Sequence, residues 1–201
     1  MDPGHIVILS WWLATPAAGA VASLCCANNP GMVGELDRYG RLKTPDVHAE
    51  VFKQLTDSLK ISKVTEVDFS SCGIGPVALG HLSDWVRDAT GAVDAVVLSG
   101  NLLLGNRDVQ SQEEYDQHGS TMPCDYGGFN SFCEALKPTS IKHLDLSECR
   151  LDASATSSLA DAIKLMGAVE AIAIGHNPIT SAGGATLLET IKTSKLKTID
   201  I

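Results

Sequence analysis

Residues 141–151 read IKHLDLSECRL. Apolar side chains stand at the first, fourth, sixth and eleventh places of this segment, and a cysteine stands at the ninth. The same frame, with asparagine or cysteine at the ninth place, recurs along the chain. The clean copies are Val64-Val67-Phe69-Cys72-Ile74, Val93-Val96-Leu98-Asn101-Leu103, Ile141-Leu144-Leu146-Cys149-Leu151 and Val169-Ile172-Ile174-Asn177-Ile179. A weaker copy is Val21-Leu24-Cys26-Asn29, and a further one begins with Leu196, Ile199 and Ile201.

The frames start near residues 21, 64, 93, 141, 169 and 196, so most of them follow one another at about 28 residues. Between frames the apolar spacing becomes helical, as at Phe52, Leu55 and Leu59. Each interval therefore predicts one strand followed by one helix. Two intervals are longer, and we assign their extra residues to insertions at 35–50 and 106–128.

The ninth place of the frame alternates between two residue types along the chain: Asn29, Cys72, Asn101, Cys149 and Asn177. This alternation and the frame resemble the ribonuclease-inhibitor-like subfamily of leucine-rich-repeat proteins. The resemblance implies an α/β fold over residues 1–201, a single leucine-rich-repeat solenoid (horseshoe) with a parallel β-sheet on the concave face and helices on the convex face. A buried Asn at the ninth place must then bond to backbone groups of its turn.

The segment 3–34 has no Asp, Glu, Lys or Arg, which raises the alternative of a membrane span or a signal peptide. Pro16, Gly19 and Pro30 interrupt it, and residues 9–15 match the helix that precedes a frame elsewhere. We therefore expect a helix of an earlier repeat here and no association with a membrane. The chain is expected to be a fragment of a longer protein, and to be poorly soluble or self-associating alone because both ends expose apolar surface.

Composition narrows the classes of function. The formal net charge of -9 argues against nucleic-acid binding, which needs Lys and Arg to neutralise phosphates. The six cysteines include no C-x-x-C pair, which favours a reducing compartment and an intracellular, cytoplasmic protein. No spacing of His48, His118, Cys124 and Asp125 matches a metal template, and there is no nucleophile or phosphate-loop motif. We predict no enzyme activity, no metal and no cofactor, and we expect the tryptophans Trp11, Trp12 and Trp85 to pack on helices.

Side chains between the apolar places of a strand point to its other face. The candidate partner-binding residues of the concave face are Glu66, Asp68, Asp94, Lys142, His143, Asp145, Glu148, Glu170 and His176. Most are acidic, and Asp200 lies at an equivalent place. An alternative is that Asp68, Asp145 and Asp200 only follow the L-D-L-S consensus of the family.

The insertions supply a second set of candidates, because loops on a rigid scaffold often carry binding. The candidates are Arg38, Tyr39, Arg41, Glu113, Glu114 and Tyr115. Both insertions follow an Asn turn, so we expect them at the same edge, about 10 Å apart at the usual strand spacing. The alternative is that the insertions are lineage-specific decoration without a binding function, or are disordered.

These features predict a non-catalytic protein–protein interaction scaffold or assembly subunit, which binds protein partners through the concave face and the edge insertions. The resemblance implies an alternative, the repeat domain of a GTPase-activating, ubiquitin-ligase or innate-immune-receptor-like protein. A GTPase activator would place arginines on strand-end loops, where Arg150 lies.

Overall fold

The computed structural model describes residues 1–89, 93–108 and 121–201. The strands are β1 (Ser23–Cys25), β2 (Glu35–Leu36), β3 (Leu42–Thr44), β4 (Glu66–Asp68), β5 (Ala95–Val97), β6 (His143–Asp145), β7 (Ala171–Ala173) and β8 (Thr198–Asp200). The helices are α1 (Pro3–Leu13), the 3-10 helix η1 (Pro16–Ala18), α2 (Ala49–Ile61), α3 (Pro76–Asp88), α5 (Gly127–Leu136), α6 (Ala153–Ile163) and α7 (Thr180–Thr193).

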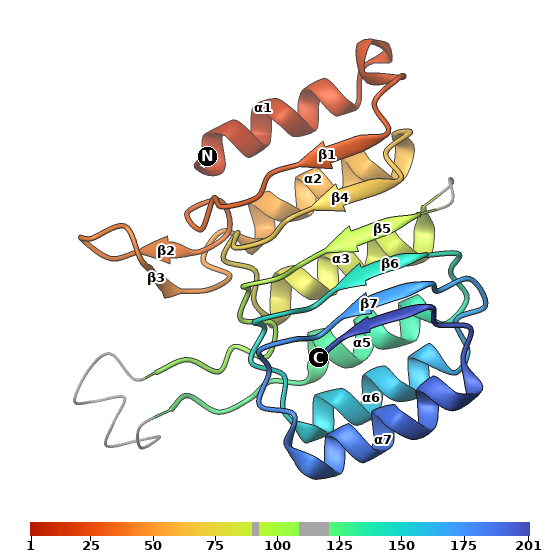
Figure 1. Ribbon diagram of the computed structural model, residues 1–201. Helices are drawn as coiled ribbons and strands as arrows, with labels where there is room; N and C mark the ends of the chain where they lie inside the picture. Colours follow the sequence, from red (N-terminus) through yellow and green to blue (C-terminus); the bar gives the residue numbers. More distant parts are fainter. Residues whose placement is uncertain (90–92, 109–120) are drawn as a thin grey trace.

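Six strands form one parallel sheet in the order β1-β4-β5-β6-β7-β8, which is also their order in the chain. Each strand of this sheet begins two residues after the start of a sequence frame. The helices that connect the strands lie together on one side of the sheet (Figure 1). The predicted combination of a parallel sheet with helices in an α/β fold is therefore confirmed.

The core lies between the sheet and the helices. The middle residue of each inner strand is buried there, as Val67, Val96, Leu144 and Ile172 show, because side chains alternate across a strand. The residues on either side of it point to the opposite face, which no described helix covers. This surface, hereafter the open face, consists of Ser23, Cys25, Glu66, Asp68, Ala95, Val97, His143, Asp145, Ala171, Ala173, Thr198 and Asp200.

The predicted turn chemistry is confirmed at the ninth place of the frame. The amide of Asn101 is fully buried, donates to the carbonyls of Phe69 and Leu98 (both 2.8 Å), and accepts from the backbone N–H groups of Cys72 and Ile74 (both 3.0 Å). It thus joins its own turn to the previous one. The thiol of Cys149 makes a weaker version of this contact, donating to the Leu98 carbonyl at 3.2 Å.

The N-terminal helix differs from expectation in two respects. It begins at Pro3, because Asp2 accepts from the backbone N–H of His5 and proline suits the first helical position. Trp85 is buried as predicted, but the prediction that Trp11 and Trp12 pack is wrong: they are 70% and 37% exposed. The reason is that α1 is apolar on every side and, among the described elements, packs against α2 and the short η1 only. Among the described residues, no helix is long and apolar enough to cross a membrane.

Candidate functional site

The open face has a regular composition across the sheet. β4, β6 and β8 present polar or charged side chains, which are Glu66, Asp68, His143, Asp145, Thr198 and Asp200. The strands between them, β5 and β7, present Ala95, Val97, Ala171 and Ala173. Carboxylates therefore recur at every second strand, about 10 Å apart at the usual spacing, with small apolar side chains between them.

A hollow lies on this face between β6 and β8, hereafter the trough. Its lining includes Ala171 and Ala173 on β7, Val97 on β5, and the pairs His143 and Asp145 on β6 and Thr198 and Asp200 on β8. The floor is apolar, and each of the two rims carries one carboxylate. Sequence reasoning missed the floor residues, although their alternation with the apolar frame places could have indicated them.

Four charged residues form pairs along the amino ends of the strands. Lys142 contacts Asp94 at 2.6 Å, and Lys197 contacts Glu170 at 2.9 Å. The hydrogen bond to Asp94 raises the pKa of Lys142, and the hydrogen bond from Lys197 lowers the pKa of Glu170. Three candidates, Asp94, Lys142 and Glu170, are therefore already paired. The acidic surface is narrower than the sequence suggested, and consists of Glu66, Asp68, Asp145 and Asp200.

Asp68 and Asp145 also have a local role. Each accepts from the backbone N–H two residues later, Ser70 at 3.0 Å and Ser147 at 2.9 Å, and so closes the turn that follows its strand. This contact explains an Asp at these places without any partner. Both side chains are half-buried and belong to the open face.

Glu148 and His176, two further candidates, lie beside the open face and not on it. Both are exposed residues of the turns that follow β6 and β7, with left-handed backbone at φ 57° and 58°. The equivalent place in the turn after β5 is Gly100, at φ 71°. These two side chains therefore lie at the carboxyl ends of the strands, the edge of the sheet from which the two insertions also leave.

The first insertion folds as an antiparallel hairpin of β2 and β3 (Figure 1). Its tip places the guanidinium carbons of Arg38 and Arg41 at 4.7 and 5.9 Å from the ring centre of Tyr39. Asp37 fixes this turn, because its Oδ1 accepts from the backbone N–H groups of Tyr39 and Arg41. The three sequence candidates Arg38, Tyr39 and Arg41 therefore form one exposed cluster, hereafter the hairpin tip.

Asp46, which sequence reasoning missed, attaches the first insertion to the sheet-and-helix body. Its carboxylate accepts from the backbone N–H groups of Gly75, Val77 and Ala78 at 2.8, 2.7 and 3.1 Å. These are the first amides of α3, whose own N-cap residue, Gly75, has no side chain. Burial raises the pKa of the Asp46 carboxyl, although the three backbone hydrogen bonds act in the opposite direction.

We expect Asp46→Ala to lower the free energy of unfolding by about 1–2 kcal/mol, since the first amides of α3 lose the carboxylate that accepts from them. Urea unfolding followed by circular dichroism measures the change. Asp161→Ala, a truncation of an exposed aspartate on α6, is the control and should leave the midpoint nearly unchanged. Equal midpoints for the two variants would contradict the capping role.

The second insertion is tied to the turn after β6. Asn106 donates to the Arg150 carbonyl at 3.1 Å, and the Arg150 guanidinium contacts Asp108 at 3.2 Å. Arg150, the residue considered for GTPase activation, is thus engaged within the chain. The candidates Glu113, Glu114 and Tyr115 lie outside the described residues.

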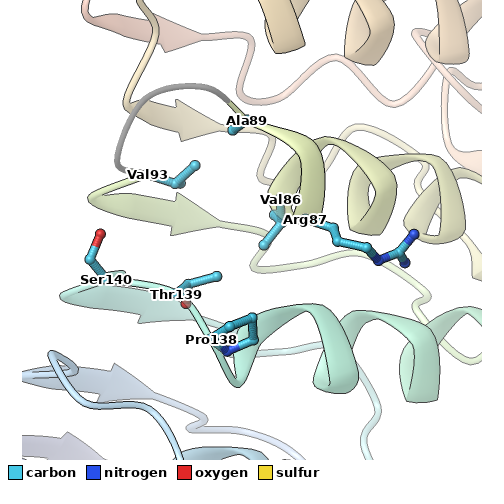
Figure 2. Close-up of a pocket in the computed structure, with 7 residues that line it drawn as sticks. All are labelled: Val86, Arg87, Ala89, Val93, Pro138, Thr139 and Ser140. Carbon is cyan, nitrogen blue, oxygen red and sulfur yellow. The ribbon is translucent and has the colours of Figure 1, made fainter.

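A second pocket lies at the amino ends of β5 and β6, where α3 and α5 lead into these strands. Figure 2 shows its lining, which is Val86, Arg87, Ala89, Val93, Pro138, Thr139 and Ser140. The guanidinium of Arg87 points away from the other side chains in this view and pairs with Asp84 at 2.9 Å. The hydroxyl of Thr139 donates to the Leu136 carbonyl.

Four buried cysteines are not activated as nucleophiles. Burial raises the pKa of Cys26 to about 11 and the pKa of Cys72, Cys133 and Cys149 to about 12, so these thiols stay protonated at neutral pH. Within the described ranges, no group of three or more His, Cys, Asp or Glu side chains could hold a metal ion. His118 lies outside these ranges.

Comparison with models of known protein families finds no match, and comparison with curated proteins finds none either.

Proposed function

We propose that this chain is a leucine-rich-repeat solenoid of the ribonuclease-inhibitor-like type, and that it acts as a non-catalytic scaffold for protein partners inside the cell. The repeat assignment is supported by the six frames, by the strand that follows each frame start, and by the alternation of Asn and Cys at turns where the side chain bonds to backbone carbonyls. In this proposal the open face is the concave surface of a horseshoe.

The observation that carries the binding role is the open face itself. Six strands present a surface that no described helix covers, on which small apolar side chains alternate with carboxylates. Glu66, Asp145 and Asp200 form no ion pair with any described residue. Small apolar residues permit close approach, and unpaired charges provide orientation and selectivity toward a partner of opposite charge.

The test compares two variants that add the same charge at different surfaces. Ala171→Arg/Ala173→Arg changes the open face, and Ala182→Arg/Ala185→Arg changes exposed positions on α7. Both are used with the wild-type chain as baits in native extract, followed by quantitative mass spectrometry, after matching urea midpoints establish that the variants are folded. We expect a set of proteins that wild type and the α7 variant capture and the open-face variant loses. If the open-face variant retains every partner, the proposal is wrong.

A further inference from the structure

The hairpin tip is an exposed cationic cluster, held in place by backbone hydrogen bonds, on an acidic protein. Tyr39 is 67% exposed, and neither Arg38 nor Arg41 forms an ion pair with another residue of the described chain. The turn is held by the two amides that bond to Asp37 and by the backbone bond from the Asp37 N–H to the Arg41 carbonyl, at 2.8 Å. A preordered tip loses less conformational entropy on binding than a flexible loop does.

The trough on the open face has the opposite properties. Its floor, Ala171 and Ala173, is apolar and shallow, so an aromatic ring can lie over it. Its rims are two strands apart, about 10 Å, and carry Asp145 and Asp200, which form no ion pair within the described ranges. An occupant that suits the trough has one aromatic ring with a cation on either side.

We propose that the hairpin tip of one copy of this chain docks in the trough of a second copy. Tyr39 then covers Ala171 and Ala173, and Arg38 and Arg41 pair with Asp145 and Asp200. This proposal rests on the proposed function, in which the open face is the binding surface. It adds that a second copy of the chain is one partner of that surface. Guanidinium and carboxylate groups pair through two parallel hydrogen bonds, which gives this contact directional specificity as well as charge complementarity.

The hairpin tip of one copy does not dock in the trough of the same copy. The hairpin leaves the chain between β1 and α2, and β1 and β4 lie three to four strands from β7, about 14–19 Å across the sheet. Figure 1 shows the hairpin projecting beyond the edge of the sheet, away from β6–β8. Asp46 fixes its base to α3. The tip that docks in the trough therefore belongs to a second copy of the chain.

The exposed apolar side of α1 offers another route to association of copies. The side of α1 that faces away from α2 exposes Val7, Ile8 and Trp11. It carries no charge, so charge reversal at the hairpin tip or the trough leaves it intact. A variant of α1 therefore separates the two modes of association.

The experiment is sedimentation velocity of the full chain over a range of concentrations. Arg38→Asp/Arg41→Asp reverses the tip, and Asp145→Lys/Asp200→Lys reverses both rims of the trough. We expect each to weaken self-association at least about tenfold in Kd, and the combination of all four changes to restore it to within about threefold of wild type, since tip and trough are again complementary. Tyr39→Ala, which alters an exposed side chain only, should also weaken association about tenfold.

The control is Lys164→Asp/Lys192→Asp, which applies the same charge change to exposed positions on α6 and α7 and should not alter association. A wild-type chain that remains monomeric overturns the proposal, as does a combined variant that does not recover. Loss of association in Trp11→Lys together with no effect of the tip variant would assign the contact to α1 and also overturn it.

The two proposals fail separately. If the chain is monomeric while Ala171→Arg/Ala173→Arg still loses partners from extract, self-docking is wrong and the scaffold function stands. If the tip and the trough mediate association but no other partner depends on the open face, self-docking stands and a scaffold for different proteins is wrong.

Discussion

Asn101→Ala is expected to lower the free energy of unfolding by about 3–4 kcal/mol. The side chain is fully buried and makes hydrogen bonds with four backbone groups of two successive turns. Alanine leaves two N–H groups and two carbonyls without these partners, and a buried polar group without a partner costs about 1–3 kcal/mol. Partial access of water to the relaxed turns reduces the sum. Urea denaturation followed by circular dichroism measures the difference.

Two other Asn→Ala variants provide the comparison for the loss of stability in Asn101→Ala. Asn130→Ala removes the same amide from an exposed position on α5 and should shift the midpoint little. Asn177→Ala should cost about 1–3 kcal/mol, because Asn177 makes equivalent bonds to Leu146, Ile174, Cys149 and Leu151 but is partly exposed. If Asn101→Ala were no more harmful than Asn130→Ala, the turns would be stable without the amide and its structural role would be wrong.

Leu146→Ala should destabilise the protein by about 2–5 kcal/mol, as for other fully buried leucines whose removal leaves a cavity. Leu146 follows β6, is 0% exposed and lies in the continuous core beneath the sheet. Its backbone N–H bonds to the Ala173 carbonyl of β7, so the neighbouring strand limits how far the site can collapse. Thermal and urea unfolding should both show the loss.

Leu188→Ala is the matched control for this variant. Leu188 lies on α7 and is 56% exposed, so the same truncation removes far less buried surface and should change the free energy by less than about 1 kcal/mol. Similar losses for the two leucines would show that Leu146 does not contribute to the core as its burial indicates.

The sequence frame predicted the strands well because the alternation of side chains along a strand determines which of its places are apolar. In residues 141–151, Leu144 and Leu146 alternate with polar neighbours, which places both under the sheet, and the helical spacing of Phe52, Leu55 and Leu59 likewise buries all three. The Asn turns were predictable for a similar reason. Asn101 lies three residues after the buried Leu98, and its partners are backbone groups that every turn offers whatever its sequence.

The features that were missed depend on residues far apart in the chain. Lys142 pairs with Asp94 across 48 positions, and Asp46 caps a helix that begins 30 residues later. No local pattern encodes either contact, because each requires the register of neighbouring strands or the path of an insertion. The exposure of Trp11 was missed for another reason: an apolar helix indicates burial on all sides, whereas α1 has a neighbour on one side only.

The order of the strands determines how the protein bears load. β1 and β8 are the outermost strands of the described sheet, and each helix from α1 to α6 packs against the next one in the chain, so α1 and β8 lie at opposite ends of the stack (Figure 1). Tension applied between the two ends acts across the strands, along the direction of their hydrogen bonds. We therefore expect the layers at the two ends to separate first, one after another, and the inner layers to stay folded until their neighbours have separated.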